Sequence, residues 1–376
     1  MNIAILGYGV VGSGVDHIIT TRGQNKHHVT KVWSRPNPKK QIPHLVSTIK
    51  EIINDESIDC VVETLNGIEP AHEHILACLN AGKHVISANK AVIAKYYEEF
   101  QAAAKKNDVQ FKFEASVGGG IPWLKELGRA KRIDTITSCS GILNGTSNYI
   151  LSTMTKEQAD FEAVLKDAQA LGFAEANPSA DIDGFDVLNK IMITANVGFN
   201  GRVQAEDFLV CSMRPVTASD IQYFKNKGYT LKYLGQVEAE NQQYEGSVMI
   251  NACLEDSLEA NTNQNYNCAT LQGDTIGTLT FYGQGAGQFP TAHAIVQDLL
   301  DLESDRPQVN QELQDFTFHA KTKNNFWIRT NQQIPEKFIA GQDNQYSQLM
   351  PMNLIEFKEN LLPLLKKEDL VVRMPL

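Results

Sequence analysis

The sequence lacks the features that mark membrane, secreted or zinc-cluster proteins. Its apolar runs stop short of the roughly 18–20 residues that cross a bilayer, and it opens on a strand-like run rather than a signal peptide. None of its six cysteines belongs to a C-x-x-C pair, which argues against a zinc site or a disulfide framework. We therefore expect a cytoplasmic protein with free thiols.

Basic residues are scarce relative to acidic ones. Lys and Arg number 34 against 44 Asp and Glu, for a formal net charge of -10. Binding to nucleic acid depends on clustered Lys and Arg, so we expect neither a nucleic-acid nor a membrane partner, but a small-molecule substrate. The 376 residues, 42% of them hydrophobic, are too many for one ordinary domain, and two or three domains are expected.

The amino-terminal residues follow the pattern strand, glycine turn, helix. A β-prone run, Asn2–Leu6, precedes Gly-Tyr-Gly-Val-Val-Gly and an apolar, helix-like stretch. In a dinucleotide-binding turn the first glycine allows the tight turn, the second lets the backbone approach the pyrophosphate, and the third lets the helix pack against the strand. A merely structural turn is the alternative, but the flanking strand and helix favour cofactor binding. The expected cofactor contacts are Gly7, Gly9, Val10, Val11 and Gly12.

The second predicted strand, residues 29–34, lacks the acid that usually binds the ribose 2′-hydroxyl of NAD. Residues 17–50 include no acid at all, but seven lysines and arginines. Arg35, with Lys39 or Lys40 nearby, could bind a 2′-phosphate, which favours NADP over NAD. A solvated basic loop is the alternative interpretation.

Strands and helices continue to alternate through the first third of the chain. Strands are predicted over residues 59–64, 84–87 and 110–115, and a helix over 71–81. This alternation predicts an α/β fold with a doubly wound, Rossmann-type parallel sheet, whose ligands gather at the carboxyl ends of the strands. Lys90 follows one such end and is a candidate for contact with cofactor or substrate.

Two further segments combine small and polar residues. In residues 116–122 three successive glycines expose backbone carbonyls, which together with Glu114 could coordinate a hard cation; a flexible hinge is an equally natural interpretation. In residues 141–151 small polar groups lie between an apolar strand and a predicted helix. Thr146 could there bind a ligand that carries a carboxylate or an ammonium group.

The segment that ends at Lys190 is the most informative one. Four acids, Glu175, Asp181, Asp183 and Asp186, precede this single lysine. Asp186 and Lys190 are four residues apart at the start of an apolar helix, so their side chains share one face. Such density of acids favours a site for a zwitterionic substrate, and a plain solvated helix start is the alternative.

Together these motifs resemble the homoserine dehydrogenases, which interconvert L-homoserine and L-aspartate 4-semialdehyde. The resemblance rests on residues 7–12, 81–90, 114–122, 141–151, 171–190, 282–287 and 290–292. It implies an NAD(P)-dependent oxidoreductase of threonine and methionine biosynthesis that forms a homodimer or homotetramer. Beyond the Rossmann-type sheet it implies an α+β domain for substrate binding and dimerisation, followed by a short C-terminal domain.

The resemblance also assigns roles to individual residues. It implies a catalytic set of Lys190, Lys90 and Asp186, and a substrate-binding set of Glu175, Asp181, Asp186, Thr146 and Gly145. Lys90, Gly285 and Gly287 are further cofactor contacts, and a monovalent cation, Na⁺, is implied at Glu114, Val117, Gly119 and Ile121, mostly through backbone carbonyls. Oxidation of an alcohol needs a base for the hydroxyl proton, and Lys190 is our candidate.

The implied domains are residues 1–120 with 285–303 for the dinucleotide, residues 121–284 for the substrate, and residues 304–376 at the C-terminus. Two departures from the family pattern stand out. Asn177 replaces an acid, and the C-terminal residues are best interpreted as a degenerate ACT-like domain. Two other functions are considered, a noncatalytic dinucleotide-sensing oligomer and a dehydrogenase of another small amino acid.

Overall fold

The computed structural model describes residues 1–22, 26–35, 41–303 and 313–375. The chain divides into two compact units, each built from two separate segments. Unit 1 comprises Met1–Glu126 and Gln284–Leu313, and unit 2 comprises Leu127–Gly283 and Gln314–Leu376. Among the described residues, no helix is long and apolar enough to cross a membrane.

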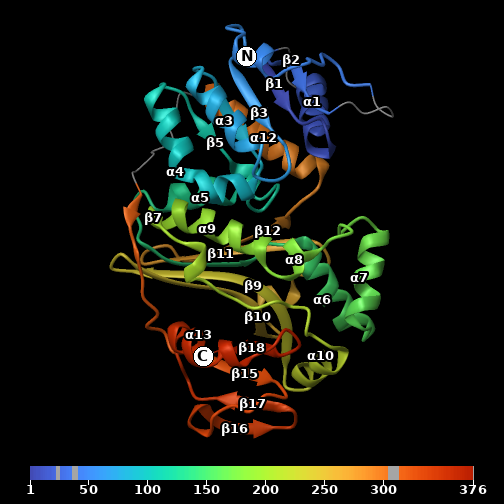
Figure 1. Ribbon diagram of the computed structural model, residues 1–376, viewed down its shortest axis with the longest axis vertical. Coiled ribbons are helices and arrows are strands. Elements are labelled where there is room, and N and C mark those ends of the chain that lie inside the picture. The colour runs from blue at the N-terminus through green and yellow to red at the C-terminus, as the bar shows by residue number, and fades with distance from the viewer. Residues whose placement is uncertain (23–25, 36–40, 304–312, 376) are drawn as a thin grey trace. The chain divides into compact units, whose positions relative to one another are not determined.

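Unit 1 is built on a five-stranded sheet in which every neighbouring pair is parallel (Figure 1). The strand order is β2-β1-β3-β4-β5, with β1 Asn2–Leu6, β2 His28–Trp33, β3 Cys60–Glu63, β4 His84–Ser87 and β5 Phe111–Lys112. Parallel strands buried on both faces read as continuous apolar runs, which is the pattern of β1 and β3. The predicted Rossmann-type sheet is thus confirmed.

Helices from both segments of unit 1 cover this sheet. The helices are α1 (Val10–Arg22), α2 (Lys50–Ile53), α3 (Ala71–Asn80), α4 (Lys90–Lys106) and α12 (Gln288–Glu303). Helices α1 and α12 pack against each other, and their buried side chains, such as Val15 and Ile295, share one apolar core with Ile3 and Val62 of the strands. Helices α3 and α4 form a second contacting pair.

The end of the first segment differs from its predicted form. A strand was expected over residues 110–115, but β5 is only Phe111–Lys112 and a 3-10 turn, η1, follows at Glu114–Ser116. The backbone N–H of Glu114 donates to Asp298 of α12, 2.9 Å away, and the Glu114 carboxylate turns toward another helix. These polar contacts replace the ladder bonds that an extended strand would need.

Unit 2 contains a large mixed sheet with helices on it (Figure 1). The main path is β12-β11-β6-β9-β10-β18-β15-β17-β16, and β8 and β14 also pair with β10. The bounds are β6 Ile136–Ile142, β8 Leu209–Val210, β9 Tyr229–Glu240, β10 Gln243–Leu254, β11 Tyr266–Gly273, β12 Gly277–Gln284, β14 Thr317–Phe318, β15 Asn325–Arg329, β16 Ile339–Asp343, β17 Tyr346–Leu349 and β18 Leu370–Met374. Strands β7 (Gly201–Arg202) and β13 (Gln314–Asp315) form a separate pair.

The helices of this part of the chain are α5 Trp123–Ala130, α6 Gly145–Glu157, α7 Phe161–Ala170, α8 Ser179–Ile182, α9 Phe185–Phe199, α10 Ala218–Lys225, α11 Leu258–Asn261 and α13 Leu354–Asn360, with 3-10 turns at Ala205–Asp207, Glu336–Phe338 and Leu362–Leu364. Helices α6 and α9 both contact β9 of the sheet. Helix α9 is buried over most of its length, as expected for a helix that is apolar on nearly every side.

The C-terminal residues 314–376 group with the middle of the chain. Their strand β18 pairs in parallel with β10. The connection is reinforced by Arg329 of β15, whose guanidinium donates to both carboxylate oxygens of Asp220 at 2.7 and 2.9 Å. The ACT-like character of this segment stays a prediction. All six cysteines are free thiols.

Candidate functional site

The glycine turn of unit 1 is closed by contacts that only glycine permits. Gly7 has φ +91°, and its N–H donates to Trp33 O at 2.8 Å. A Cβ added at Gly12 would lie 2.1 Å from Gly7 O, whereas one at Gly9 would meet nothing within 4 Å. The turn is therefore tight at its first and third glycines and open at the second, the arrangement that leaves backbone free to approach a pyrophosphate.

The helix that follows begins directly at this opening. Helix α1 starts at Val10, which is 67% exposed, and continues through Val11. The first N–H groups of a helix have no partner within the helix and favour an anion. The end of β2 lies beside the turn, because Tyr8 N donates to Ser34 Oγ at 3.2 Å, and the next residue, Arg35, is exposed. Lys39 and Lys40 lie outside the described residues.

A buried carboxyl that the sequence analysis did not single out lies at the end of β3. Glu63 is fully buried, accepts from Leu65 N at 2.7 Å and from Ser87 Oγ at 2.5 Å, and burial raises the pKa of its carboxyl to about 7. Ser87 Oγ accepts in turn from Asn89 N at 3.1 Å. Asn89 caps α4, whose first residue is Lys90. Glu63 thus supports the backbone that presents Lys90. The sequence feature that could have identified Glu63 is a single acid at the end of an apolar strand.

Glu114 uses its side chain to cap a helix. Its carboxylate oxygens accept from Leu124 N at 3.0 Å and Lys125 N at 2.7 Å, at the start of α5. Burial, followed by the charge of Asp298, raises the pKa of Glu114 to about 8, and burial raises that of Asp298 to about 7. Both carboxylate oxygens are thus committed to α5, and the backbone carbonyl of Glu114 accepts from Val117 N at 3.4 Å.

The other residues of the predicted cation site belong to a compact turn. Val117 and Ile121 are buried, and Gly119 has φ +57°. A Cβ at Gly119 would lie 2.5 Å from the carbonyl carbon of Gly285, so the returning segment packs on this turn, and Gly287 follows at φ +125° just before α12. The turn is thus largely buried, and the hinge interpretation stays a prediction. Hard cations bind carbonyl oxygens, and a cation at this turn stays a prediction.

In unit 2 three predicted site residues meet around an asparagine. Lys190 Nζ donates to Asp186 Oδ2 and to Leu143 O, each at 2.7 Å. Asn144 Nδ2 donates to Asp186 Oδ2 at 2.8 Å and to Asp181 Oδ1 at 2.7 Å. The side chains of Lys190 and Asp186 are 10% and 5% exposed, so a solvated helix start is the wrong interpretation. Asn144 also caps α6, through Ser147 N at 2.8 Å.

The remaining predicted substrate residues are placed differently. Thr146 is buried and its hydroxyl donates to Phe173 O at 2.6 Å, while Gly145 is the first residue of α6. Glu175 is exposed, and its carboxylate has no hydrogen bond or ion pair with any residue that the structure describes. The structure therefore brings Asp181, Asp186 and Lys190 together, whereas Glu175 makes no hydrogen bond or ion pair with any of the three.

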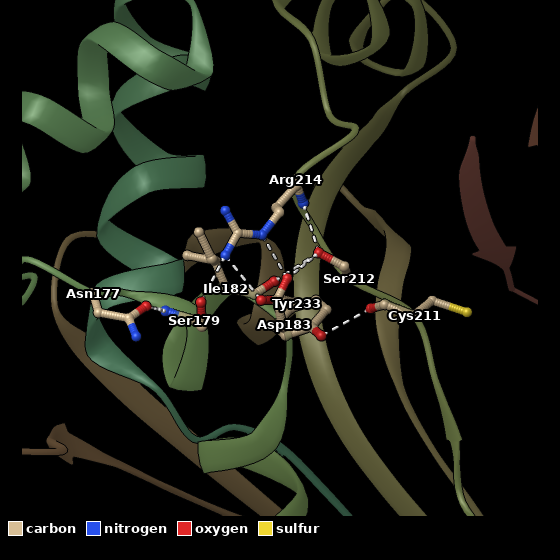
Figure 2. A network of polar contacts seen from close by, with 8 residues as sticks. All are labelled: Asn177, Ser179, Ile182, Asp183, Cys211, Ser212, Arg214 and Tyr233. Atoms are coloured by element: carbon tan, nitrogen blue, oxygen red, sulfur yellow. Dashed lines mark hydrogen bonds and ion pairs between the residues drawn. The ribbon is translucent and has the colours of Figure 1, made fainter. Parts of the chain in front are cut away.

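The fourth acid of this segment, Asp183, belongs to a separate polar network (Figure 2). Arg214 contacts both of its carboxylate oxygens, at 2.6 and 2.8 Å, and Ser212 Oγ donates to it at 2.8 Å. Arg214 also donates to Ser179 Oγ at 3.0 Å. The guanidinium of Arg214 holds the pKa of Asp183 below its usual range. Asp183 thus links the segment that carries Asp181 to the loop that carries Ser212 and Arg214.

We expect Arg214→Ala to lower the free energy of unfolding at pH 7 by about 0.5–1 kcal/mol, the range for a partly exposed pair. The depressed pKa of Asp183 contributes stability above the unfolded value of about 3.9, and this contribution is lost as the pH falls through the folded value. Urea unfolding at pH 7 and pH 3 would measure both effects. Arg132→Ala, at an exposed arginine, is the control. A deficit that persists undiminished at pH 3 would count against the ion pair.

Comparisons with known protein families match two long stretches of the chain. The model of the homoserine dehydrogenase NAD binding domain matches residues 7–114, and that of the homoserine dehydrogenase domain matches residues 122–300. A homoserine dehydrogenase of Synechocystis is 40% identical over an alignment of 316 residues, and the match covers 80% of this chain and 73% of the relative. The chain belongs to the homoserine dehydrogenase family.

Solved structures agree with this assignment. A homoserine dehydrogenase of Thiobacillus denitrificans superposes with a TM-score of 0.87 at 29% identity, and one of S. aureus with 0.78 at 32% identity. Each comparison covers 100% of this chain and 98% of the other. The resemblance seen in the sequence is thus confirmed. As a member of the homoserine dehydrogenase family the chain is an NAD(P)-dependent oxidoreductase that acts on a CH–OH group.

Proposed function

We propose that the protein oxidises the primary alcohol of L-homoserine to L-aspartate 4-semialdehyde, and catalyses the reverse reduction, in threonine and methionine biosynthesis. The observation that carries the proposal is the buried contact of Lys190 with Asp186 and Leu143 O, beside the Asn144 bridge to Asp181. A lysine so fixed is placed to take and return the hydroxyl proton. A noncatalytic dinucleotide sensor would not need a buried lysine held in this way.

Different residues are proposed for substrate binding and for proton transfer. Asp181, Asp186, Thr146 and Glu175 are proposed to hold the ammonium and carboxylate groups of the amino acid, with Gly145 lending its backbone. Lys190 accepts the hydroxyl proton as a neutral amine and becomes the ammonium that returns it in the reverse reduction, and Lys90 assists at the reacting carbon. Each turnover removes one hydride and one proton from the CH₂–OH group and leaves an aldehyde. The nicotinamide, when bound, supplies the hydride acceptor.

The cofactor preference that we propose is NADP. The open second glycine and the start of α1 fit a pyrophosphate, and Gly285 and Gly287 would lie on the nicotinamide side. Trp33 and Ser34 are both bonded to the turn, so the chain directs exposed Arg35 beside it. A guanidinium there matches a 2′-phosphate.

We expect Arg35→Ser to raise the KM for NADP about tenfold and to leave the KM for NAD nearly unchanged. A charge-assisted hydrogen bond contributes about 1.5–3 kcal/mol, and about 1.4 kcal/mol corresponds to a factor of ten. Initial rates with each cofactor would measure the ratio. Lys50→Ser, an exposed lysine on α2 in the same basic stretch, is the matched control. Equal losses with both cofactors would contradict a role in phosphate recognition.

A monovalent cation, Na⁺, is proposed at the turn formed by Glu114, Val117, Gly119 and Ile121, with backbone carbonyls as ligands. The commitment of the Glu114 carboxylate to α5 and the burial of the turn support this choice. We also propose a homodimer or homotetramer in the cytoplasm. Light scattering that found only a 41.7 kDa species would contradict the oligomer.

The experiment that tests the function is an absorbance assay at the wavelength of the reduced nicotinamide. Purified protein is mixed with L-homoserine and NADP or NAD, with sodium, potassium or choline chloride at equal ionic strength. Cofactor reduction that depends on homoserine is expected, faster with NADP and with sodium. If no combination reduces the cofactor, the substrate assignment falls. Reduction with another small amino acid alone would identify a different substrate.

A further inference from the structure

Unit 2 contains a small polar cavity remote in sequence from the proposed catalytic residues. In the antiparallel pair of β9 and β10, Glu238 lies opposite Glu245 and Gln236 lies opposite Ser247. Because side chains alternate along a strand, these four share one face of the sheet. The cavity on this face is lined by Gln236, Val237, Glu238, Glu245, Gly246, Ser247, Asn324, Leu354 and Arg373.

Three buried oxygen atoms of the cavity wall are unsatisfied. They are Glu245 Oε2, Ser247 Oγ and Asn324 Oδ1, which have no hydrogen-bond partner among the described residues. The three residues are 8%, 0% and 1% exposed, so bulk water does not reach them freely. Buried polar atoms are nearly always satisfied in native proteins, and all three line this one cavity.

Neighbouring contacts fix two of these oxygens in place. Thr322 N donates to the other carboxylate oxygen of Glu245 at 3.1 Å, and Asn324 Nδ2 donates to Thr322 O at 3.0 Å. Asn324 is itself held by backbone bonds with Met352 in both directions. Turning the Asn324 amide would place its oxygen against Thr322 O and lose that bond. The acceptors are therefore presented to the cavity by a rigid frame.

The side chains that line the cavity carry a net negative charge. Glu238 and Glu245 are opposite each other, where like charges repel, and Arg373 is the one cation among the lining residues. Arg373 already donates to Gln236 Oε1 at 2.8 Å and lies 3.8 Å from Glu238 Oε1. Burial raises the pKa of Glu245, in keeping with a carboxylate short of positive charge. Acceptors and net negative charge together exclude an anion.

We propose that this cavity binds one small monovalent cation, with Glu245, Ser247 and Asn324 as oxygen ligands. Hard cations take carboxylate, hydroxyl and amide oxygens, the three types present. One positive charge balances the excess of two carboxylates over one guanidinium. The cavity has room for about one water-sized group, which excludes a ligand the size of an amino acid. This site lies in unit 2 and does not depend on the proposed catalytic role of the chain.

Crystals of the full chain soaked in rubidium or thallous salts test the proposal directly. An anomalous peak is expected between Glu245, Ser247 and Asn324. Ser247→Ala should remove or weaken this peak while any peak at the Gly119 turn in unit 1 persists. An ordered water at this position without an anomalous signal in the unsubstituted protein would overturn the proposal.

Thermal unfolding provides a measurement in solution that does not need crystals. The melting temperature is compared in potassium and in choline chloride at equal ionic strength, because a ligand bound to the folded state raises it. The gain in potassium should be smaller in Glu245→Gln than in the unsubstituted protein and unchanged in Glu255→Gln, an exposed glutamate. An equal gain in all three proteins would overturn the site, whatever the activity assay shows.

Discussion

Replacing Lys190 with methionine is expected to lower kcat for homoserine oxidation at least about a hundredfold while the Kd for NADPH stays unchanged. A positioned general base contributes about 10²–10⁴-fold, and Lys190 is the lysine fixed between Asp186 and Leu143 O. The loss should appear in kcat and in kcat/KM alike, because the proton moves only during the chemical step. Stopped-flow single turnovers and NADPH fluorescence titration would measure the two quantities.

Removal of Lys190 also leaves Asp186 buried without its cation, which is destabilising in itself. The double variant Lys190→Met with Asp186→Asn removes this excess charge, and its thermal unfolding shows how much of any instability of Lys190→Met comes from the unpaired carboxylate; its turnover is not compared, because Asp186 is itself proposed to bind substrate. Lys166→Met, at an exposed lysine of α7, is the matched control and should retain full turnover. Near-normal turnover of a well-folded Lys190→Met protein would exclude Lys190 from proton transfer.

Gly12→Ala is expected to weaken NADPH binding about tenfold to a hundredfold. The new methyl group would lie 2.1 Å from Gly7 O and 2.9 Å from Thr64 Oγ1, so the turn must shift. Overpacking of this kind costs about 1–3 kcal/mol, and this distortion falls on the backbone that approaches the pyrophosphate. Thr64 makes the shift harder, since its hydroxyl holds Gly7 O at 2.8 Å.

The matched control for Gly12→Ala is Gly128→Ala. Gly128 lies within α5, and an added Cβ there meets nothing within 4 Å, so this variant should bind NADPH normally and be no less stable. Fluorescence titration with NADPH would compare the two variants. Unchanged affinity in Gly12→Ala would show that the turn tolerates the methyl group and that Gly12 is not needed for cofactor binding.

Local patterns in the sequence predicted the parts of the fold that depend on near neighbours. Strand β1 has the predicted bounds, Asn2–Leu6, because a short apolar run before a glycine turn admits few other structures. The face shared by Asp186 and Lys190 follows from helical spacing alone, and the structure shows their contact. The parallel sheet of unit 1 likewise follows from the alternation of strands and helices.

Contacts between distant residues could not be predicted in this way. Asn144 bridges Asp181 and Asp186, which are 37 and 42 residues away, and only its capping position before α6 is visible in the sequence. Glu63 appears as one acid in a strand until Ser87 is placed beside it. Four acids near one lysine looked like a single cluster, yet Asp183 is committed to Arg214. Density of charge along the chain does not reveal the direction of each side chain.

The division of unit 1 between two segments has a consequence for synthesis on the ribosome. Helix α12 supplies Ile295 and Leu299 to the core that covers β1 and β3, yet it follows them by more than two hundred residues of chain. Until it emerges, Ile3, Ile5 and Val62 lack part of their apolar cover. A nascent chain that ends before residue 284 therefore exposes an apolar surface of the kind that chaperones bind, and unit 1, although its translation begins first, cannot complete its core until α12 has been made.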